Sequence, residues 1–208
     1  MRAVGLLILA LALAGCSALP DKPVRPVLYD FGPMDRAGTN VPVSTTLPPL
    51  VLADVGASGS FDSSAVLYRL GYSDSHQLRP YSLARWSAQP AQLVRQRLRE
   101  RLSRDRMVLD DADAALLARS GPNRPRILRV ELEEFSHYFQ STAQSSGLLR
   151  LRCTLLENSA GGERLLAQRS FAYERAAPSA DAPGGVRALT AAIDAAGEEI
   201  AAWVAQQR

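Results

Sequence analysis

The sequence predicts an α+β fold, a two-layer sandwich in which a mainly antiparallel sheet is covered on one face by two amphipathic helices. Three observations lead to this prediction. Residues 126–174 hold three long segments in which apolar side chains alternate, as in half-buried strands. Residues 90–105 and 181–203 instead carry apolar side chains at helical spacing. A core of about 150 residues is large enough to fold alone.

The elements before the first helix are short. Residues 27–32 and 50–55 are brief apolar runs that predict strands, and residues 65–72 alternate with the period of a strand. A Ser-Asp-Ser turn follows, so residues 76–83 are expected to return as the second arm of a hairpin. Because Pro80 interrupts this arm, we expect it to be an edge strand or irregular.

The first predicted helix spans residues 90–105 and begins at Pro90, a residue favoured in the first turn. Its apolar side chains recur at helical spacing, and its other faces are rich in arginine: Arg95, Arg97, Arg99, Arg101 and Arg104. Residues 107–109 are a candidate strand, and residues 112–119 are expected to add a helical turn or two. The arginine-rich face is a solvated surface in the simplest interpretation, and a contact for lipid head groups in the alternative.

The three long strands each present one apolar row to the core. In residues 126–140 this row changes parity at Glu133 and Glu134, and a β-bulge there would keep all of its members on the core face. The expected inward residues are Leu128, Val130, Leu132, Phe135 and Phe139, then Leu149, Leu151, Cys153 and Leu155, then Leu165, Ala167, Phe171 and Tyr173.

The last predicted helix has the strongest periodicity in the chain. Its apolar positions are separated by alternating steps of three and four residues: Val186, Leu189, Ile193, Ala196, Ile200 and Trp203. Asp181 is a suitable N-cap, and Pro183 stands just inside the first turn. This helix and the helix over 90–105 are therefore expected to cover the same face of the sheet.

The N-terminus predicts export and lipidation. Arg2 precedes a short apolar run, which is typical of a signal peptide and only about half of the ~20 residues that span a bilayer. The run ends in Leu-Ala-Gly-Cys, which resembles the bacterial lipobox. By that resemblance, residues 1–15 are removed and Cys16 is acylated and becomes the first mature residue. Ser17 follows it, and by the usual sorting pattern this favours the outer membrane.

Residues 16–49 are expected to form the lipidated start and a proline-rich tether, and residues 50–208 the folded domain. Seven of the thirteen prolines lie in this tether segment, and proline resists both helix interiors and sheet ladders. Once Cys16 is lipidated, Cys153 has no intramolecular partner, and we expect it to be a small buried residue.

Composition disfavours several kinds of chemistry. A net charge of +3 is too weak to suggest nucleic-acid binding, which an exported chain would not perform. Two Cys and two His nearly exclude a structural zinc site, and no Walker loop is present. His137 neighbours Ser136, but adjacent strand residues point to opposite faces, so a nucleophile–base pair is not indicated. The chain is therefore predicted to be no enzyme and to need no cofactor.

A set of aromatic and arginine residues carries a family resemblance. The chain resembles the ABC-type transport auxiliary lipoprotein family, the PqiC-like proteins, over essentially the whole mature sequence. The matching residues are the lipobox, Tyr29-Asp30-Phe31-Gly32-Pro33, Tyr68-Arg69-Leu70-Gly71-Tyr72-Ser73-Asp74, Leu78-Arg79-Pro80-Tyr81, Arg85-Trp86, Pro90-Ala91-Gln92-Leu93, and the Gly184-Gly185 helix that ends in Trp203. This resemblance implies a non-catalytic subunit at the periplasmic side of the outer membrane. It would dock an MCE-domain protein that bridges the periplasm for lipid transport.

Arg69, Tyr81, Arg85 and Trp86 are the candidate contacts for this partner, because Tyr, Trp and Arg dominate protein–protein hot spots. In the competing interpretation, Tyr68 and Tyr72 face the core and Trp86 packs where the first helix begins. Arg69 has the opposite strand parity and is the better candidate. Two other functions stay open, a lipid carrier that holds an acyl chain between helices and sheet, and a structural, pilotin-like assembly lipoprotein. Homo-oligomerisation also stays open.

Overall fold

The computed structural model describes residues 24–33, 47–110, 112–113, 125–159 and 162–207. The signal peptide and Cys16 lie outside these described residues. So do most of the helical turns expected over 112–119 and the tip of the last hairpin at 160–161. No helix within the described ranges is both long and apolar enough to cross a membrane.

The chain order of the elements matches the predicted order, with one additional short strand and a 3-10 turn. They are β1 Val27–Tyr29, β2 Leu50–Leu52, β3 Gly56–Ala57, the 3-10 helix η2 Gly59–Phe61, β4 Ala65–Leu70, β5 Asp74–Trp86, α2 Pro90–Leu102, β6 Val108–Leu109, β7 Arg126–Phe139, β8 Ser145–Ser159, β9 Gly162–Ala176 and α4 Ala182–Gln206.

Strand β7 is the centre of the sheet. On one side it pairs antiparallel with β8, and β8 pairs antiparallel with β9. On its other side β7 pairs in parallel with β2, β3 and β4 along its length. Strand β5 pairs antiparallel with β4, and β1 lies parallel on the outer side of β5. The α+β prediction is confirmed. The sheet is mixed, because the long strands pair antiparallel and short strands add to them in parallel.

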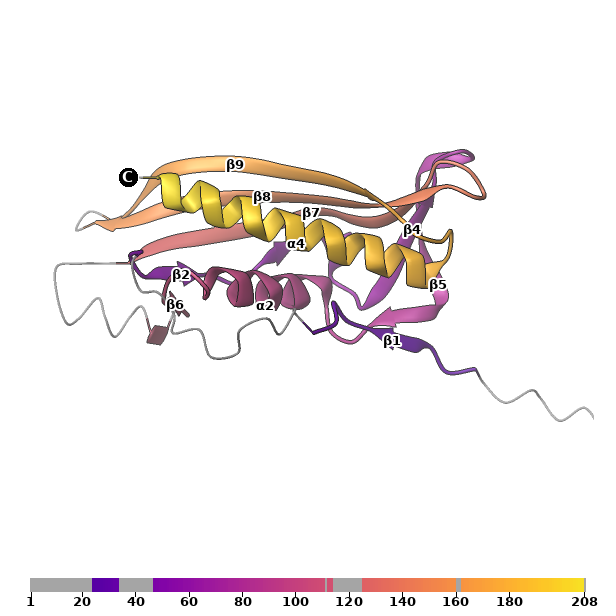
Figure 1. Ribbon diagram of the computed structural model, residues 1–208, viewed down its shortest axis with the longest axis horizontal. Coiled ribbons are helices and arrows are strands. Elements are labelled where there is room, and N and C mark those ends of the chain that lie inside the picture. Colours follow the sequence, from indigo (N-terminus) through magenta and orange to yellow (C-terminus); the bar gives the residue numbers. More distant parts are fainter. Residues whose placement is uncertain (1–23, 34–46, 111, 114–124, 160–161, 208) are drawn as a thin grey trace, which may run out of the picture.

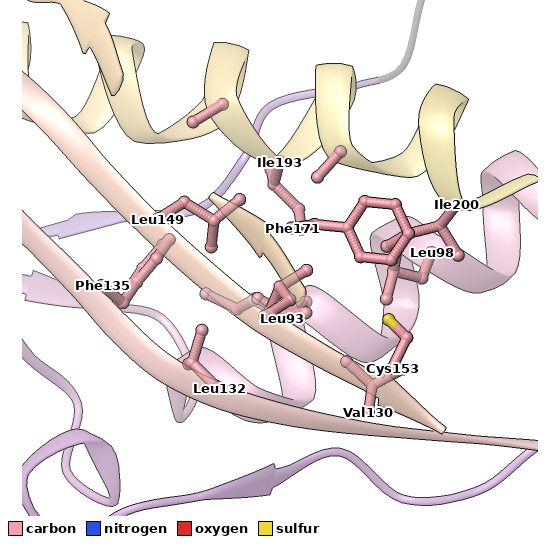
Figure 2. Close-up of a cluster of buried hydrophobic side chains, with 14 of the residues drawn as sticks. Leu93, Leu98, Val130, Leu132, Phe135, Leu149, Cys153, Phe171, Ile193 and Ile200 are labelled. Atoms are coloured by element: carbon pink, nitrogen blue, oxygen red, sulfur yellow. The ribbon is translucent and has the colours of Figure 1, made fainter. Parts of the chain in front are cut away.

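Both helices lie on the same face of this sheet, as predicted. Figure 1 shows α4 running across the long strands, with α2 beside it. Figure 2 shows side chains from both helices, such as Leu98 and Ile193, meeting side chains from β7, β8 and β9, such as Phe135, Leu149 and Phe171. All six apolar positions predicted for α4 are buried, and the Asp181 carboxylate accepts a hydrogen bond from Gly184 N at 2.8 Å.

The predicted β-bulge in β7 is confirmed. Leu132 pairs with Leu151 and Glu134 with Arg150, so Glu133 is the extra residue. The bulge resets the alternation, and the five predicted inward residues of β7 are all buried. The predicted inward row of β8, which includes Cys153, is likewise buried.

The prediction for Leu165 in β9 is wrong. Leu165 is 59% exposed. Leu155 pairs with Ala167 and Leu156 with Leu165, so Leu166 is an extra residue that shifts the alternation. Leu166 packs against the core in its place. Because Leu165 and Leu166 are both apolar and adjacent, an inward row of alternating residues can pass through either of them. The sequence pattern therefore did not reveal this second bulge.

The predicted boundary at residue 50 also needs correction. Strand β1, within the expected tether, pairs with residues 84–86 of β5. The Phe31 ring is buried, with its centroid 5.5 Å from that of Trp86 and 5.9 Å from that of Phe135. The folded part therefore includes residues 24–33. Residues 16–49 are not one continuous free tether.

Strand β5 continues through Pro80, and the expected edge position explains how. Pro80 pairs with Leu67 on one side, while β1 reaches only residues 84–86 on the other. No described strand pairs with β5 at Pro80 on the side of β1. The N–H group that proline lacks would have no partner strand there, so the sheet loses no hydrogen bond. The predicted edge character of this arm is confirmed, but the strand is longer than expected.

The close approach of α4 to β8 generates a stability prediction. A Cβ atom at Gly147 would lie 2.7 Å from Leu189 N and 2.8 Å from Ala188 C, both backbone atoms of α4. We expect Gly147→Ala to lower the free energy of unfolding by about 1–3 kcal/mol, because overpacking must displace the helix. Urea unfolding of the mature chain measures this. Gly59→Ala is the matched control, since a Cβ there meets nothing within 4 Å. Equal stability of the two variants would contradict this account of the packing.

Candidate functional site

The four candidate contact residues lie on β4 and β5, but the structure does not bring them to one surface. Tyr81 faces the helix side of the sheet, where its ring packs on Tyr68 at a centroid distance of 4.6 Å. Arg69 follows Tyr68 directly in β4 and points to the opposite face. Trp86 lies in the core. The candidate site is therefore divided between two faces.

Trp86 is a core residue, so the prediction that it contacts a partner is wrong. Only 2% of it is exposed. Its ring packs against those of Phe31 and Phe135, the latter at a centroid distance of 5.3 Å. The competing interpretation of Trp86 is thus the correct one. For Tyr72, however, the core-facing interpretation is wrong, because β4 ends at Leu70 and Tyr72 is 49% exposed in the following turn.

Arg69 and Arg85 are half-buried and held by the fold. The Arg69 guanidinium lies 3.1 Å from the Glu134 carboxylate, and both side chains keep about a fifth of their surface exposed (20% and 22%). Arg69 also donates to the Ser75 carbonyl at 3.3 Å. Arg85 donates to the carbonyl oxygens of Tyr81 and Ala84. These contacts fix both side chains within the folded domain.

Tyr81 belongs to a buried polar contact that the sequence did not reveal. Its hydroxyl lies within hydrogen-bond distance, 2.8 Å, of His137 Nδ1. His137 is fully buried, and its ring packs so closely on α4 that a Cβ at Gly185 would lie 2.5 Å from it. Burial lowers the pKa of His137 to about 4, although the Asp181 carboxylate opposes this shift. His137 is therefore neutral at pH 7.

The arginines of α2 form ion pairs instead of an open basic face. Arg97 Nε lies 2.9 Å from Asp194, and Arg101 Nε lies 2.6 Å from Glu198. Arg97 and Arg101 are four residues apart in α2, as their two partners are in α4, so the helices lie side by side and run in the same direction. The sequence shows the equal spacing of the two arginines and of the two acids, but it does not show that the two helices lie together.

A groove of about 460 Å³ lies between the two helices. Its walls carry the charged side chains of Arg97, Arg101, Arg104, Asp194 and Glu198, together with apolar residues such as Ile193. Beneath the helices, the side chains of Figure 2 occupy the space between helices and sheet. A charged groove of this kind does not match the apolar pocket that an acyl carrier requires.

The described residues contain no group of three or more His, Cys, Asp or Glu that could hold a metal ion. The Cys153 thiol is fully buried, and burial raises its pKa to about 12, so it is a poor nucleophile. Ser136 is buried beside His137 in β7, but the His137 Nδ1 atom faces Tyr81.

His137 generates a pH prediction. Its pKa is 6.5 when unfolded and about 4 when folded, so the unfolded chain binds more protons between these values. Stability is then complete above pH 6.5 and falls as pH drops toward 4, by at most about 3 kcal/mol. Thermal unfolding across this range should show the loss in the native chain and a flatter profile in His137→Gln. His76→Gln is the control, since the His76 side chain is 96% exposed. An unchanged slope in His137→Gln would contradict the assignment.

The fold is similar to that of solved structures with low sequence identity. Protein XCC0632 from Xanthomonas campestris, assigned to the family DUF330, matches with a TM-score of 0.64 and 17% identity, covering 79% of this chain and 88% of that one. A structure described as an uncharacterized protein matches with a TM-score of 0.60 and 15% identity, covering 86% and 99%. At these identities the likeness supports the fold alone. Comparison with curated proteins finds no match.

A family model provides the assignment. The model of the ABC-type transport auxiliary lipoprotein component matches residues 29–201, which is most of the chain. The matched range begins at Tyr29, the last residue of β1, and ends within α4, so it spans all the strands from β2 to β9 and all of α2. It also contains Arg69, Tyr81 and Arg85. The chain therefore belongs to the family of ABC-type transport auxiliary lipoprotein components.

Proposed function

We propose that the protein is a non-catalytic outer-membrane lipoprotein subunit of an ABC/MCE-type intermembrane lipid transport system. Acylated Cys16 holds the domain on the periplasmic side of the outer membrane. The folded domain docks the periplasm-spanning MCE-domain protein. The observation that carries the proposal is the family match over residues 29–201 in a chain whose N-terminus ends its apolar run in a lipobox.

The side chains available for docking lie at the β4–β5 hairpin. Arg69 is anchored by Glu134 but keeps a fifth of its side chain exposed, and the exposed Tyr72 ring lies in the adjoining turn. An arginine beside an aromatic ring is a common core of a protein–protein hot spot. Tyr81 lies on the helix side of the sheet, and Arg85 aligns with Leu28 of β1 at the other end of β5, so neither belongs to this surface. Arg69 is therefore the residue we assign to partner contact.

The non-catalytic role is supported by the state of the reactive groups. His137 is neutral and hydrogen bonded to Tyr81, and the Cys153 thiol is held in the core. The charged residues of the groove between α2 and α4 are engaged in ion pairs with each other. A structural subunit needs these contacts for rigidity and needs no reactive group.

Cys16→Ala should release the protein from the membrane into the soluble periplasmic fraction, because the acyl chains are then missing. Fractionation of cells followed by a salt wash measures this. Cys153→Ala is the matched control, since it removes the other cysteine and leaves the anchor. A Cys16→Ala form that stays membrane-bound after the salt wash would show that the anchor is elsewhere.

In-cell crosslinking tests the partner. A photo-crosslinking phenylalanine analogue in place of Tyr72 is expected to capture an MCE-domain protein, identified by mass spectrometry. The same analogue in place of the exposed Leu165, on β9, is the control and should capture far less. Arg69→Gln should reduce the yield from position 72 by about tenfold if Arg69 is a hot spot of at least ~1.4 kcal/mol.

The other candidate functions predict different products from the same experiment. Capture of a secretion or assembly complex would favour the pilotin-like alternative and reject the transport assignment. Capture of phospholipid alone would favour the carrier. Equal capture of the MCE-domain protein from positions 72 and 165 would place the docking surface elsewhere on the domain.

A further inference from the structure

Exposed apolar side chains gather at one edge of the molecule. The large apolar residues that are exposed in the described chain are Val24, Val27, Leu28, Tyr72, Leu83, Met107 and Leu165. Four of these seven belong to the edge formed by β1 and the end of β5. Val24, Val27 and Leu28 are 70%, 53% and 67% exposed, and Leu83 is 49% exposed. We call these four residues the β1 edge.

The β1 edge wraps around the margin of the sheet: Leu28 lies on the face of Leu83, and Val27, which aligns with the buried Ala84, lies on the helix-covered face. Val27 aligns with Ala84 and Leu28 with Arg85, so Leu83 lies beside the start of β1. Because Leu83 and Arg85 share one parity in β5, Leu28 and Leu83 project from the same face of the sheet. Among the described strands β1 pairs only with β5, which leaves its outer side at the margin of the sheet.

This edge is rigidly joined to the core. The Arg97 guanidinium, itself only 5% exposed, donates to the Phe31 carbonyl at 2.6 Å. The Phe31 ring packs between Trp86 and Phe135. Asp30 accepts a hydrogen bond from Gly32 N at 2.8 Å, and Gly32 has a φ of 65°, a turn conformation suited to glycine. The apolar side chains of β1 are thus presented on a fixed support.

The length of the connecting chain limits where this edge can be. Only eight residue steps separate Cys16 from Val24, and eight steps span at most about 29 Å when fully extended. A domain of about 160 residues has a radius of gyration near 15 Å and is therefore roughly 40 Å across. An acyl anchor at Cys16 consequently holds the β1 edge nearer to the membrane than most of the domain surface.

We propose that the β1 edge rests on the phospholipid surface of the membrane that anchors Cys16. Val24, Val27, Leu28 and Leu83 enter the boundary between head groups and acyl chains, where apolar side chains lose contact with water. Arg25, exposed between Val24 and Val27, lies at the level of the phosphates. This inference rests on the lipid anchor of the proposed function.

A fixed orientation of the domain follows from this contact. Strand β5 runs from Asp74 at the hairpin to Trp86 beside β1. Asp74 pairs with Leu70 at one end of β4 and Arg85 with Ala65 at the other, so these two ends of β5 are separated by the length of β4, about 17 Å. With the β1 edge on the bilayer, the hairpin surface at Arg69 and Tyr72 points into the periplasm. A partner arriving from the inner membrane would meet that end.

Fluorescence quenching in vesicles tests the orientation. The full-length acylated protein carries a single introduced cysteine, Leu28→Cys or Leu83→Cys, labelled with an environment-sensitive fluorophore. It is placed in vesicles of phosphatidylethanolamine and phosphatidylglycerol with or without nitroxide-labelled lipid. Acylated Cys16 has no free thiol, and Cys153 is fully buried, so the unsubstituted protein reports the background labelling. Leu165→Cys is the matched control, because Leu165 is equally exposed but lies on β9, away from β1.

We expect nitroxide lipid to cause a large loss of fluorescence at positions 28 and 83, with a blue shift of the emission, and little loss at position 165. No loss at 28 and 83, or an equal loss at 165, would overturn the proposal. The intact mass of each preparation distinguishes failure of the lipid anchor from failure of the membrane contact at the β1 edge. A mass without acyl chains would overturn the anchor together with this inference. An acylated protein whose position 28 is unquenched would overturn only the membrane-facing edge.

Discussion

The packing of α4 across the three long strands is the interaction on which the rest of the structure depends. Side chains such as Ile193 and Ile200 meet the inward rows of β7, β8 and β9 in one continuous core (Figure 2). Gly147 in β8 lets the backbone of α4 approach this strand closely. Gly185 in α4 lets the His137 ring of β7 approach the helix. Burial of this apolar area supplies the main free energy of folding, and it also sets where every other element can lie.

The position of α2, and through it the N-terminal edge, follows from α4. Asp194 and Glu198 face Arg97 and Arg101 across the helix pair, and Arg97 also holds the Phe31 carbonyl. Because the Arg97 side chain is almost fully buried, its charge needs these partners to offset the loss of hydration. A chain of contacts thus connects the C-terminal helix to β1, the described segment nearest the proposed lipid anchor. In the proposed membrane contact, this connection lets the short chain between Cys16 and Val24 fix the orientation of the whole domain.

The candidate contact surface was only partly predictable. Strand parity correctly separated Arg69 from Tyr68, because alternation is a local property of an extended chain. Residues close in sequence were nevertheless distributed to different environments: Trp86 to the core, Tyr81 to His137, and Arg69 to Glu134. His137 and Glu134 lie more than fifty residues away along the chain. Sequence spacing alone holds no information on such pairs, since strand pairing brings them together.

The sequence by itself determined the fold class, both helices, the inward rows of β7 and β8, the bulge at Glu133 and the family resemblance. These follow from periodicity and local motifs, which the chain carries within each segment. Only the tertiary structure decided the parallel pairing of β1 to β5, the exposure of Leu165 and the ion pairs between α2 and α4. The physical reason is that register, burial and charge pairing are properties of surfaces in contact. They are set only when segments distant in the chain compete to bury the same apolar area.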